Sequence, residues 1–145
     1  MPDSIKKQII DRVLSDLAPL VPATFREITR EWDSTRDSKA LPALMLYDGN
    51  ETTVSKTATV WTCRFPLHLK IVFSSARNSG PSKDALVAEV QKKIEADLTL
   101  NGLGAVLDAG NEIPAPTADS NPVHRTTLTY TIQYTRKIGD PTLVS

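Results

Sequence analysis

The sequence predicts an α+β domain in which a mainly antiparallel or mixed β-sheet carries two principal helices on one face. Three observations favour this class. One segment alternates apolar and polar residues from Ala58 to Phe73, and two others repeat apolar residues every three or four positions. The elements also follow one another without the regular strand-helix alternation that builds a parallel sheet. The length of 145 residues predicts a single domain over residues 1–145.

The alternating segment predicts a β-strand with one dry face, because successive side chains of a strand point to opposite sides of the sheet. The apolar parity holds Trp61, Cys63, Phe65, Leu67, Leu69, Ile71 and Phe73. At ~3.3 Å per residue the stretch from Trp61 to Phe73 would reach roughly 40 Å, about twice the usual strand length. We therefore expect a long projecting strand or hairpin, a strand that bends between two sheets, or an arm shared with a neighbouring subunit. Each of these favours assembly over catalysis.

Two helices are expected from apolar residues at helical spacing. The first spans Ile5 to Leu20, capped by Asp3 or Ser4 and ended by Pro19 and Pro22. The second spans Lys83 to Leu100 and stops at Asn101-Gly102. Its predicted apolar stripe consists of Leu86, Val90, Ile94 and Leu98.

The other expected strands are shorter or less regular. Phe25 to Trp32 is a weaker strand candidate, and Leu41 to Tyr47 is a short apolar run closed by the turn Asp48-Gly49-Asn50. The polar stretch Glu51 to Thr59 leads into the long strand. Ala105 to Ala109 is another short strand candidate, Asn111 to Pro122 reads as an irregular excursion, and Thr127 to Thr135 predicts a strand with threonines on its outward face. That face is expected to meet water or another protein.

Composition narrows the functional classes. Seventeen basic residues balance seventeen acidic ones, and no dense Lys/Arg cluster is present, so we expect no direct binding of nucleic acid. No apolar run approaches the ~20 residues that span a bilayer, so no membrane association is expected. The single cysteine, Cys63, falls on the apolar face of the long strand, which is typical of folding in a reducing cytoplasm.

No motif predicts an active site, a cofactor site or a metal site. His68 is expected on the face opposite Cys63, and neither His68 nor His124 has the spacing of a zinc ligand set. Gly102-Leu103-Gly104 follows a helix, whereas a dinucleotide fingerprint must follow a strand. Ser74-Ser75 lacks a nucleophile elbow, and the carboxylate pairs Asp33/Asp37 and Asp108/Glu112 are typical of solvated loops. We therefore expect a protein that is not an enzyme.

Several segments in a fixed order carry a resemblance to a known family. They are an N-terminal helix, a strand ending near Phe73 followed by a loop, and the helix from Asp84 to Asp97. After these come Leu98-Thr-Leu-Asn-Gly-Leu-Gly-Ala-Val-Leu107, the strand Thr127-Leu-Thr-Tyr-Thr-Ile-Gln-Tyr-Thr135 and a proline at Pro141. Together they resemble the tail terminator family of long-tailed bacteriophages, the proteins also called minor tail protein U. The region from Pro81 to Pro141 is most alike.

The resemblance implies a structural virion protein of the tail and neck that is assembled in the host cytoplasm. Members of that family form six-membered rings that bind the last ring of the tail tube, stop its growth and present a surface for joining to the head. The implied partners are further copies of this chain, the tail tube protein and a head-tail connector or neck protein.

Four residues are the candidate interface positions under this reading. The long strand would contribute Trp61 and Phe65 to the contact between subunits, with strand addition at a sheet edge as one route. Arg77 and Lys83 would contact the tube, because charges near a loop steer docking partners. The alternatives are another neck or tail-completion protein or, from a different class, a small ligand-binding domain or enzyme whose residues converge only in three dimensions.

Overall fold

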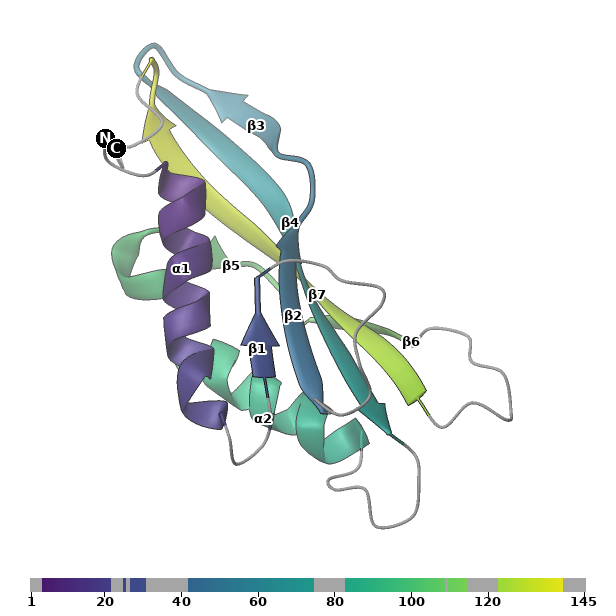
Figure 1. Ribbon diagram of the computed structural model, residues 1–145. Coiled ribbons are helices and arrows are strands. Elements are labelled where there is room, and N and C mark those ends of the chain that lie inside the picture. The colour runs from purple at the N-terminus through teal and green to yellow at the C-terminus, as the bar shows by residue number, and fades with distance from the viewer. Residues whose placement is uncertain are drawn as a thin grey trace.

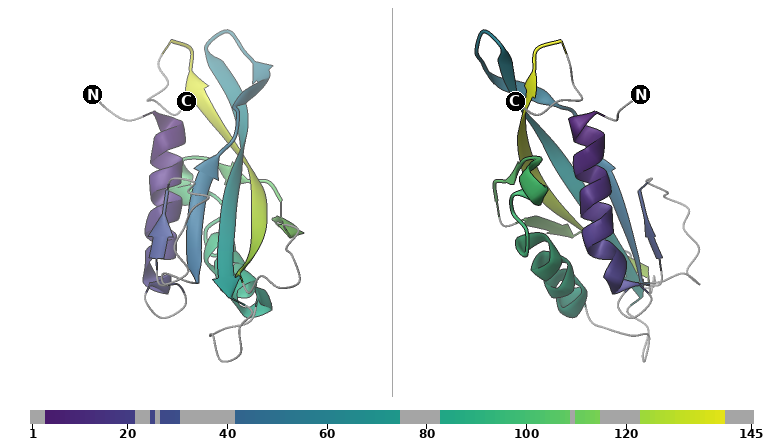
Figure 2. Two further views of the ribbon diagram at one scale, coloured as in Figure 1. Left: turned by 45° about the vertical axis from the view of Figure 1, so that its right-hand side comes forward. Right: turned by 90° about the vertical axis from the view of Figure 1, so that its left-hand side faces the viewer.

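The computed structural model describes residues 4–21, 25, 27–30, 42–74, 83–108, 110–114 and 123–139. Within these residues the chain forms a mixed sheet of seven strands with two α-helices on one side (Figures 1 and 2). One main core joins both helices to the inner face of the sheet. The predicted α+β class, with two helices packed on one face of the sheet, is therefore confirmed.

A long antiparallel pair, β4 (Val60–Ser74) and β7 (Val123–Lys137), forms the middle of the sheet. Each strand has 15 residues, and the register runs without a break from Val60 opposite Lys137 to Ser74 opposite Val123. At ~3.4 Å per residue this two-stranded ribbon is about 50 Å long. The predicted parity of the long strand is confirmed, since its inner residues Cys63, Phe65, Leu67, Leu69 and Ile71 are buried.

Both flanks of this ribbon carry interrupted strands. β2 (Ala43–Asp48) and then β3 (Thr52–Lys56) pair with the same edge of β4, and β1 (Glu27–Thr29) lies parallel to β2. On the other flank β5 (Ala105–Val106) and then β6 (Asn111–Pro114) pair with β7.

The strands β3 and β6 are not predicted from the sequence, which indicates a polar lead-in at Glu51 to Thr59 and an irregular excursion at Asn111 to Pro122. All five residues of β3 are exposed, and so are the first three of β6. Strands without a buried face show no apolar alternation, so only the backbone ladder to β4 and β7 defines them.

The helices begin close to where the sequence places them. α1 (Ile5–Leu17) is capped by Ser4, whose hydroxyl accepts a hydrogen bond from the Lys7 amide, and Pro19 lies in the following 3-10 turn η1 (Ala18–Leu20). α2 (Lys83–Glu95) buries Leu86, Val90 and Ile94 as predicted.

The end of α2 differs from the prediction. The helix stops at Glu95, and a separate 3-10 turn, η3 (Leu100–Gly102), follows it. The Asp97 carboxylate accepts hydrogen bonds from the Thr99 amide and hydroxyl, at 3.3 and 2.9 Å, and such local bonds compete with helix propagation. Leu98 is consequently 45% exposed and does not join the apolar stripe.

A proline in the central strand explains why β2 and β3 are separate. The Pro66 carbonyl accepts a hydrogen bond from the Gly49 amide at 2.8 Å. In an antiparallel ladder the N–H and C=O of one residue point to the same neighbouring strand, so the N–H that Pro66 lacks would have faced Gly49. A Cβ at Gly49 would also lie 2.4 Å from Pro66 Cγ, so the position requires glycine.

Lys6 of α1 supplies the donor that Pro66 cannot. Its ammonium donates to the Gly49 carbonyl at 3.1 Å, pairs with Asp48 at 2.8 Å and lies 5.1 Å from the centroid of the Phe65 ring. The Lys6 side chain therefore provides a donor for the backbone carbonyl that the interrupted sheet leaves unpaired, and it holds the start of α1 against the sheet.

We expect Lys6→Met to lower the free energy of unfolding by about 1–2 kcal/mol, because it leaves the Gly49 carbonyl without a donor in a partly buried place. Methionine keeps the helix propensity and much of the length of the side chain. Urea denaturation monitored by circular dichroism measures the change.

Lys7→Met is the matched control, since Lys7 pairs with Asp11 in an exposed i,i+4 contact and should change stability by less than about 0.5 kcal/mol. Equal losses in the two variants would contradict the role assigned to Lys6.

Candidate protein-protein interface

One end of the β4–β7 ribbon continues past the helix layer and is flanked by β3 (Figure 1). We call residues 52–64 and 133–139 the tip, whose inner residues Cys63 and Tyr134 are still buried in the core at its base. Its hairpin is closed by Thr57, which donates its amide to the Val60 carbonyl at 2.8 Å and accepts the Val60 amide on its hydroxyl at 3.0 Å. The Ile138 amide donates to the Thr59 carbonyl at 3.0 Å, which extends the β4–β7 pairing into this turn.

Trp61 is held between two cations at the tip. The register places Lys56 and Arg136 on either side of it in one cross-strand row. The Lys56 ammonium lies 5.0 Å and the Arg136 guanidinium carbon 4.7 Å from the centroid of a Trp61 ring. Cation–π contacts of this kind contribute about 0.5–1 kcal/mol each at exposed sites. The row therefore gives the tip a fixed aromatic and basic surface.

The tip is uniformly basic. It carries Lys56, Arg64, Arg136 and Lys137 and contains no acidic residue. Within the described parts of the chain, none of these four cations forms an ion pair with a carboxylate. Their charge is therefore available to another molecule.

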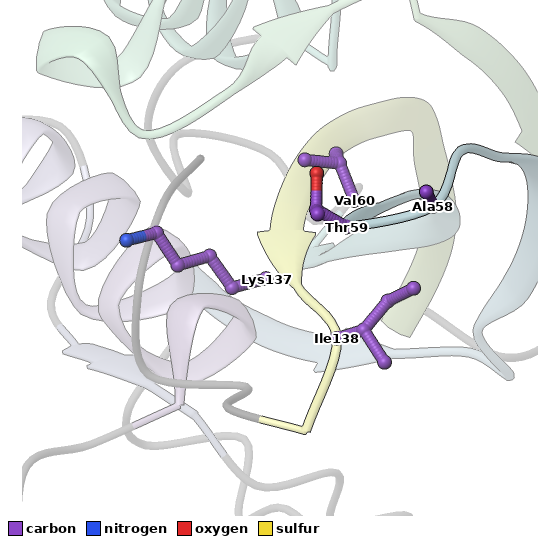
Figure 3. A pocket seen from close by; sticks show the side chains of 5 residues that line it. All are labelled: Ala58, Thr59, Val60, Lys137 and Ile138. Carbon is purple, nitrogen blue, oxygen red and sulfur yellow. The ribbon is translucent and has the colours of Figure 1, made fainter.

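A shallow pocket of about 460 Å³ lies at the end of the tip, lined by Ala58, Thr59, Val60, Lys137 and Ile138 (Figure 3). Figure 3 shows Lys137 and Ile138 extending to opposite sides of the chain at the end of β7. Ile138 is 42% exposed. The end of the ribbon thus presents a cation on one side of the chain and an apolar side chain on the other.

The outer face of the ribbon carries polar pairs across the two strands. His68 Nδ1 lies 2.9 Å from the Thr129 hydroxyl, and Arg64 Nε donates to the Gln133 amide oxygen at 2.7 Å. Burial lowers the pKa of His68 and so favours the neutral imidazole, and the charge of Asp48 opposes this in part. Thr127, Thr129, Thr131 and Thr135 of β7 have the parity of this face, as the sequence predicts, whereas Thr126 is buried on the inner face.

A second groove lies between the end of α2 and β5. It has a volume of about 380 Å³ and is lined by Glu95, Leu98, Val106, Leu107 and Asp108. Leu98 and Leu107 are 45% and 44% exposed. We call these five residues the acidic groove, because two carboxylates border its apolar surface.

Backbone and side-chain contacts fix one wall of the acidic groove. The Leu107 amide donates to the Thr131 carbonyl at 2.9 Å, and the Asp108 carboxylate accepts the Thr131 amide at 3.2 Å. In the gap between β5 and β6, the Asp108 carboxylate therefore accepts the Thr131 amide in place of a backbone carbonyl of a neighbouring strand.

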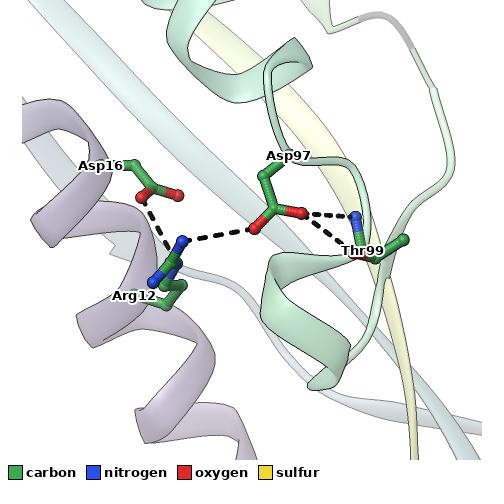
Figure 4. Close-up of polar contacts among 4 residues, drawn as sticks. All are labelled: Arg12, Asp16, Asp97 and Thr99. Carbon is green, nitrogen blue, oxygen red and sulfur yellow. Dashed lines mark hydrogen bonds and ion pairs between the residues drawn. The ribbon is translucent and has the colours of Figure 1, made fainter.

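An ion-pair network fixes the segment on the other side of the groove (Figure 4). Arg12 of α1 lies 3.5 Å from Asp97 and 3.3 Å from Asp16, and Asp97 in turn holds Thr99. The contact of Arg12 Nε with Asp16 is not aligned as a hydrogen bond. Asp97 immediately precedes Leu98, so the network positions that exposed side chain.

The four candidate interface residues fall in different places. Trp61 lies in the tip, and Lys83 begins α2 and pairs with Glu112 at 3.3 Å. Phe65 is 1% exposed and contacts Tyr134 edge to face, so its side chain belongs to the core and is corrected to a packing role. Arg77 lies outside the described residues.

The structure also shows where the residues considered for metal or dinucleotide binding lie. His68 and Cys63 lie on opposite faces of β4, and Gly102, with φ +83°, ends η3. In the described ranges, no group of three or more His, Cys, Asp or Glu side chains is arranged to hold a metal ion. The helices described here are all too short or too polar to span a membrane. No family model matches the chain, and no curated protein matches it.

The acidic groove influences Tyr130, a core residue of β7. Its hydroxyl is buried without a hydrogen-bond partner in the described structure. Burial, with smaller contributions from Glu95 and Asp108, raises the pKa of Tyr130 to about 12. Because the folded state keeps the phenol neutral, folding stability from this group is present below pH 10 and is lost as the pH rises from 10 to 12.

We expect Tyr130→Phe to leave stability at pH 7 unchanged or slightly raised, within about 1 kcal/mol, because no hydrogen bond is removed. Between pH 10 and 12 the variant should lose less stability than the wild type. Urea denaturation at pH 7 and pH 11 measures both. Tyr47→Phe, on the outer face, is the control and should follow the wild type. A large loss for Tyr130→Phe at pH 7 would reveal a partner for the hydroxyl.

Proposed function

We propose that this protein is a structural virion component that caps the tail tube of a long-tailed bacteriophage. In this role it ends polymerisation of the tube and provides the surface that joins the tail to the head or neck. It works as a homo-oligomeric ring, a hexamer, whose partners are the tail tube protein and a head-tail connector or neck protein.

The observation that carries the proposal is the β4–β7 ribbon, which outgrows the helix layer and ends in an exposed strand and a basic tip. Beyond Cys63 and Tyr134 the ribbon is flanked only by the exposed strand β3 and has little core of its own, and short hairpins without such a core are marginal in water. Contact with another protein supplies the missing burial. The resemblance of the chain from Pro81 to Pro141 to tail terminators supplies the identity of the assembly.

A ring requires that two different patches of each subunit meet, because a contact between identical patches closes as a dimer. The outer face of the ribbon lies on one side of the fold and the helices lie on the other, and the tip extends beyond the N-terminal end of α1 (Figures 1 and 2). The fold therefore offers distinct surfaces for neighbouring subunits, for the tube and for the head side.

We expect the purified protein to shorten tubes assembled from the tail tube protein of the same phage, with ring-shaped density at one tube end in negative-stain images. Capping should saturate at a small fraction of the tube-protein concentration, because each growing tube has one end. Sequestration of tube subunits would instead require nearly equal amounts.

Two outcomes would count against the proposal. Unchanged tube lengths and bare ends, with a protein that is folded by circular dichroism, would contradict it. Density at the head connector alone, with no effect on tubes, would reassign the chain to another neck or tail-completion role.

A further inference from the structure

We propose that the tip of one subunit docks in the acidic groove of the next copy of this chain, so that the subunits associate head to tail. This inference rests on the proposed ring and names its interface. The occupant of the groove is a second copy, with Ile138 against Leu98 and Leu107, and with Lys137 near Glu95 and Asp108.

The first argument is charge complementarity within one sequence. The tip holds four cations and no acidic residue, although the chain as a whole has a formal net charge of zero. The excess of positive charge at the tip is therefore balanced elsewhere on the same molecule. The acidic groove is one place where carboxylates border exposed apolar surface.

The second argument is that both sets of charges lack partners within the subunit. In the described parts of the chain Glu95 forms no ion pair, and Asp108 accepts only the backbone amide of Thr131. Two neighbouring carboxylates differ in this respect, since Asp97 pairs with Arg12 and Glu112 pairs with Lys83. Glu95 and Asp108 therefore remain as anions for an incoming cation.

The third argument is the matching of apolar surface. Leu98, Leu107 and Ile138 are among the exposed large hydrophobic residues of the described structure. Two of them lie in the groove, and the third lies in the tip pocket next to Lys137. An apolar contact bordered by opposite charges has the composition of an interface with a dry centre and a polar rim.

The fourth argument is geometry. The groove lies beside β7 where β5 pairs with Ile132 and Gln133, at the base of the tip, whereas Lys137 and Ile138 lie at the far end of the tip. One molecule cannot bring its own tip to its own groove, because the β4–β7 pairing is continuous. The two patches differ, so the contact is heterologous, and it forms a closed ring when the rotation between subunits closes.

Cysteine cross-linking between two variants tests the contact directly. The variants Ile138→Cys and Leu107→Cys are purified separately, mixed in equal amounts at high protein concentration and oxidised mildly. If the wild type sediments as a monomer, tubes of the tail tube protein are added before oxidation. The mixture should give a disulfide-linked dimer, and each variant alone should give little. The wild type, whose Cys63 is buried, is the background control.

Two results would overturn the inference. One is the absence of the mixed dimer. The other is a dimer that forms as fast from Ile138→Cys alone, which would show contact between two tips.

Charge reversal gives a second, independent readout. Lys137→Glu in the Ile138→Cys variant, or Glu95→Lys in the Leu107→Cys variant, should slow mixed cross-linking about tenfold at low salt. Combining both reversals in the same mixture should restore the rate. Lys7→Glu changes the net charge as much as Lys137→Glu but lies outside both the tip and the groove, and it should leave the rate within about twofold. Failure of the double reversal to recover would contradict an electrostatic pairing of these two residues.

The outcomes separate this inference from the proposed function. Mixed dimers without any effect on tube length would keep the interface and overturn the capping role. Capped tubes whose end rings persist with Lys137→Glu, and without the mixed disulfide, would keep the capping role and overturn this interface.

Discussion

The continuous pairing of β4 with β7 is the constraint on which the rest of the fold depends. Fifteen residues of each strand pair without a bulge, so the inner and outer faces stay in phase over the whole ribbon. Each flank is interrupted once, and a side chain completes the hydrogen bonding at each interruption. Lys6 donates to the Gly49 carbonyl on one side, and Asp108 accepts the Thr131 amide on the other. Hydrogen bonding is therefore maintained at the two places where the strands that flank the ribbon are interrupted.

The helix layer covers only part of this ribbon, and that difference in length creates the tip. α1 begins at Ile5, and Lys6 already contacts the ring of Phe65. Cys63 of β4 is still buried in the core, whereas Trp61, two residues nearer the hairpin, is only partly buried at the edge of the core and lies between two cations. The exposed edge of β3 carries a register shift between Thr53 and Ser55 and a lysine at its end, both of which discourage uncontrolled strand pairing.

The same boundary explains what the sequence could and could not predict. Alternation from Ala58 to Phe73 defines the buried parity, so the long strand and the helices that cover it follow from the pattern. β3 and β6 have no buried face and leave no pattern. The excess length of the strand indicates a projection, but the position at which it leaves the core depends on where α1 packs. Trp61 and Phe65 share one parity four residues apart, yet Trp61 is only partly buried at the edge of the core and Phe65 is fully buried within it. The acidic groove joins Glu95 to Asp108 across a turn whose course depends on Asp97.

Charge separation on a neutral chain also determines the kind of contact the subunit favours. Two tips would bring together eight cations from residues 52–64 and 133–139, which opposes a two-fold contact through this surface. Pairing a tip with a groove neutralises charge and buries apolar side chains, and it leaves one tip and one groove open after each step. Addition then continues until the last tip reaches the first groove. Because the bulged edge of β3 is poorly suited to a continuous backbone ladder, side chains at the tip, and not strand addition, are the better basis for such a closed assembly.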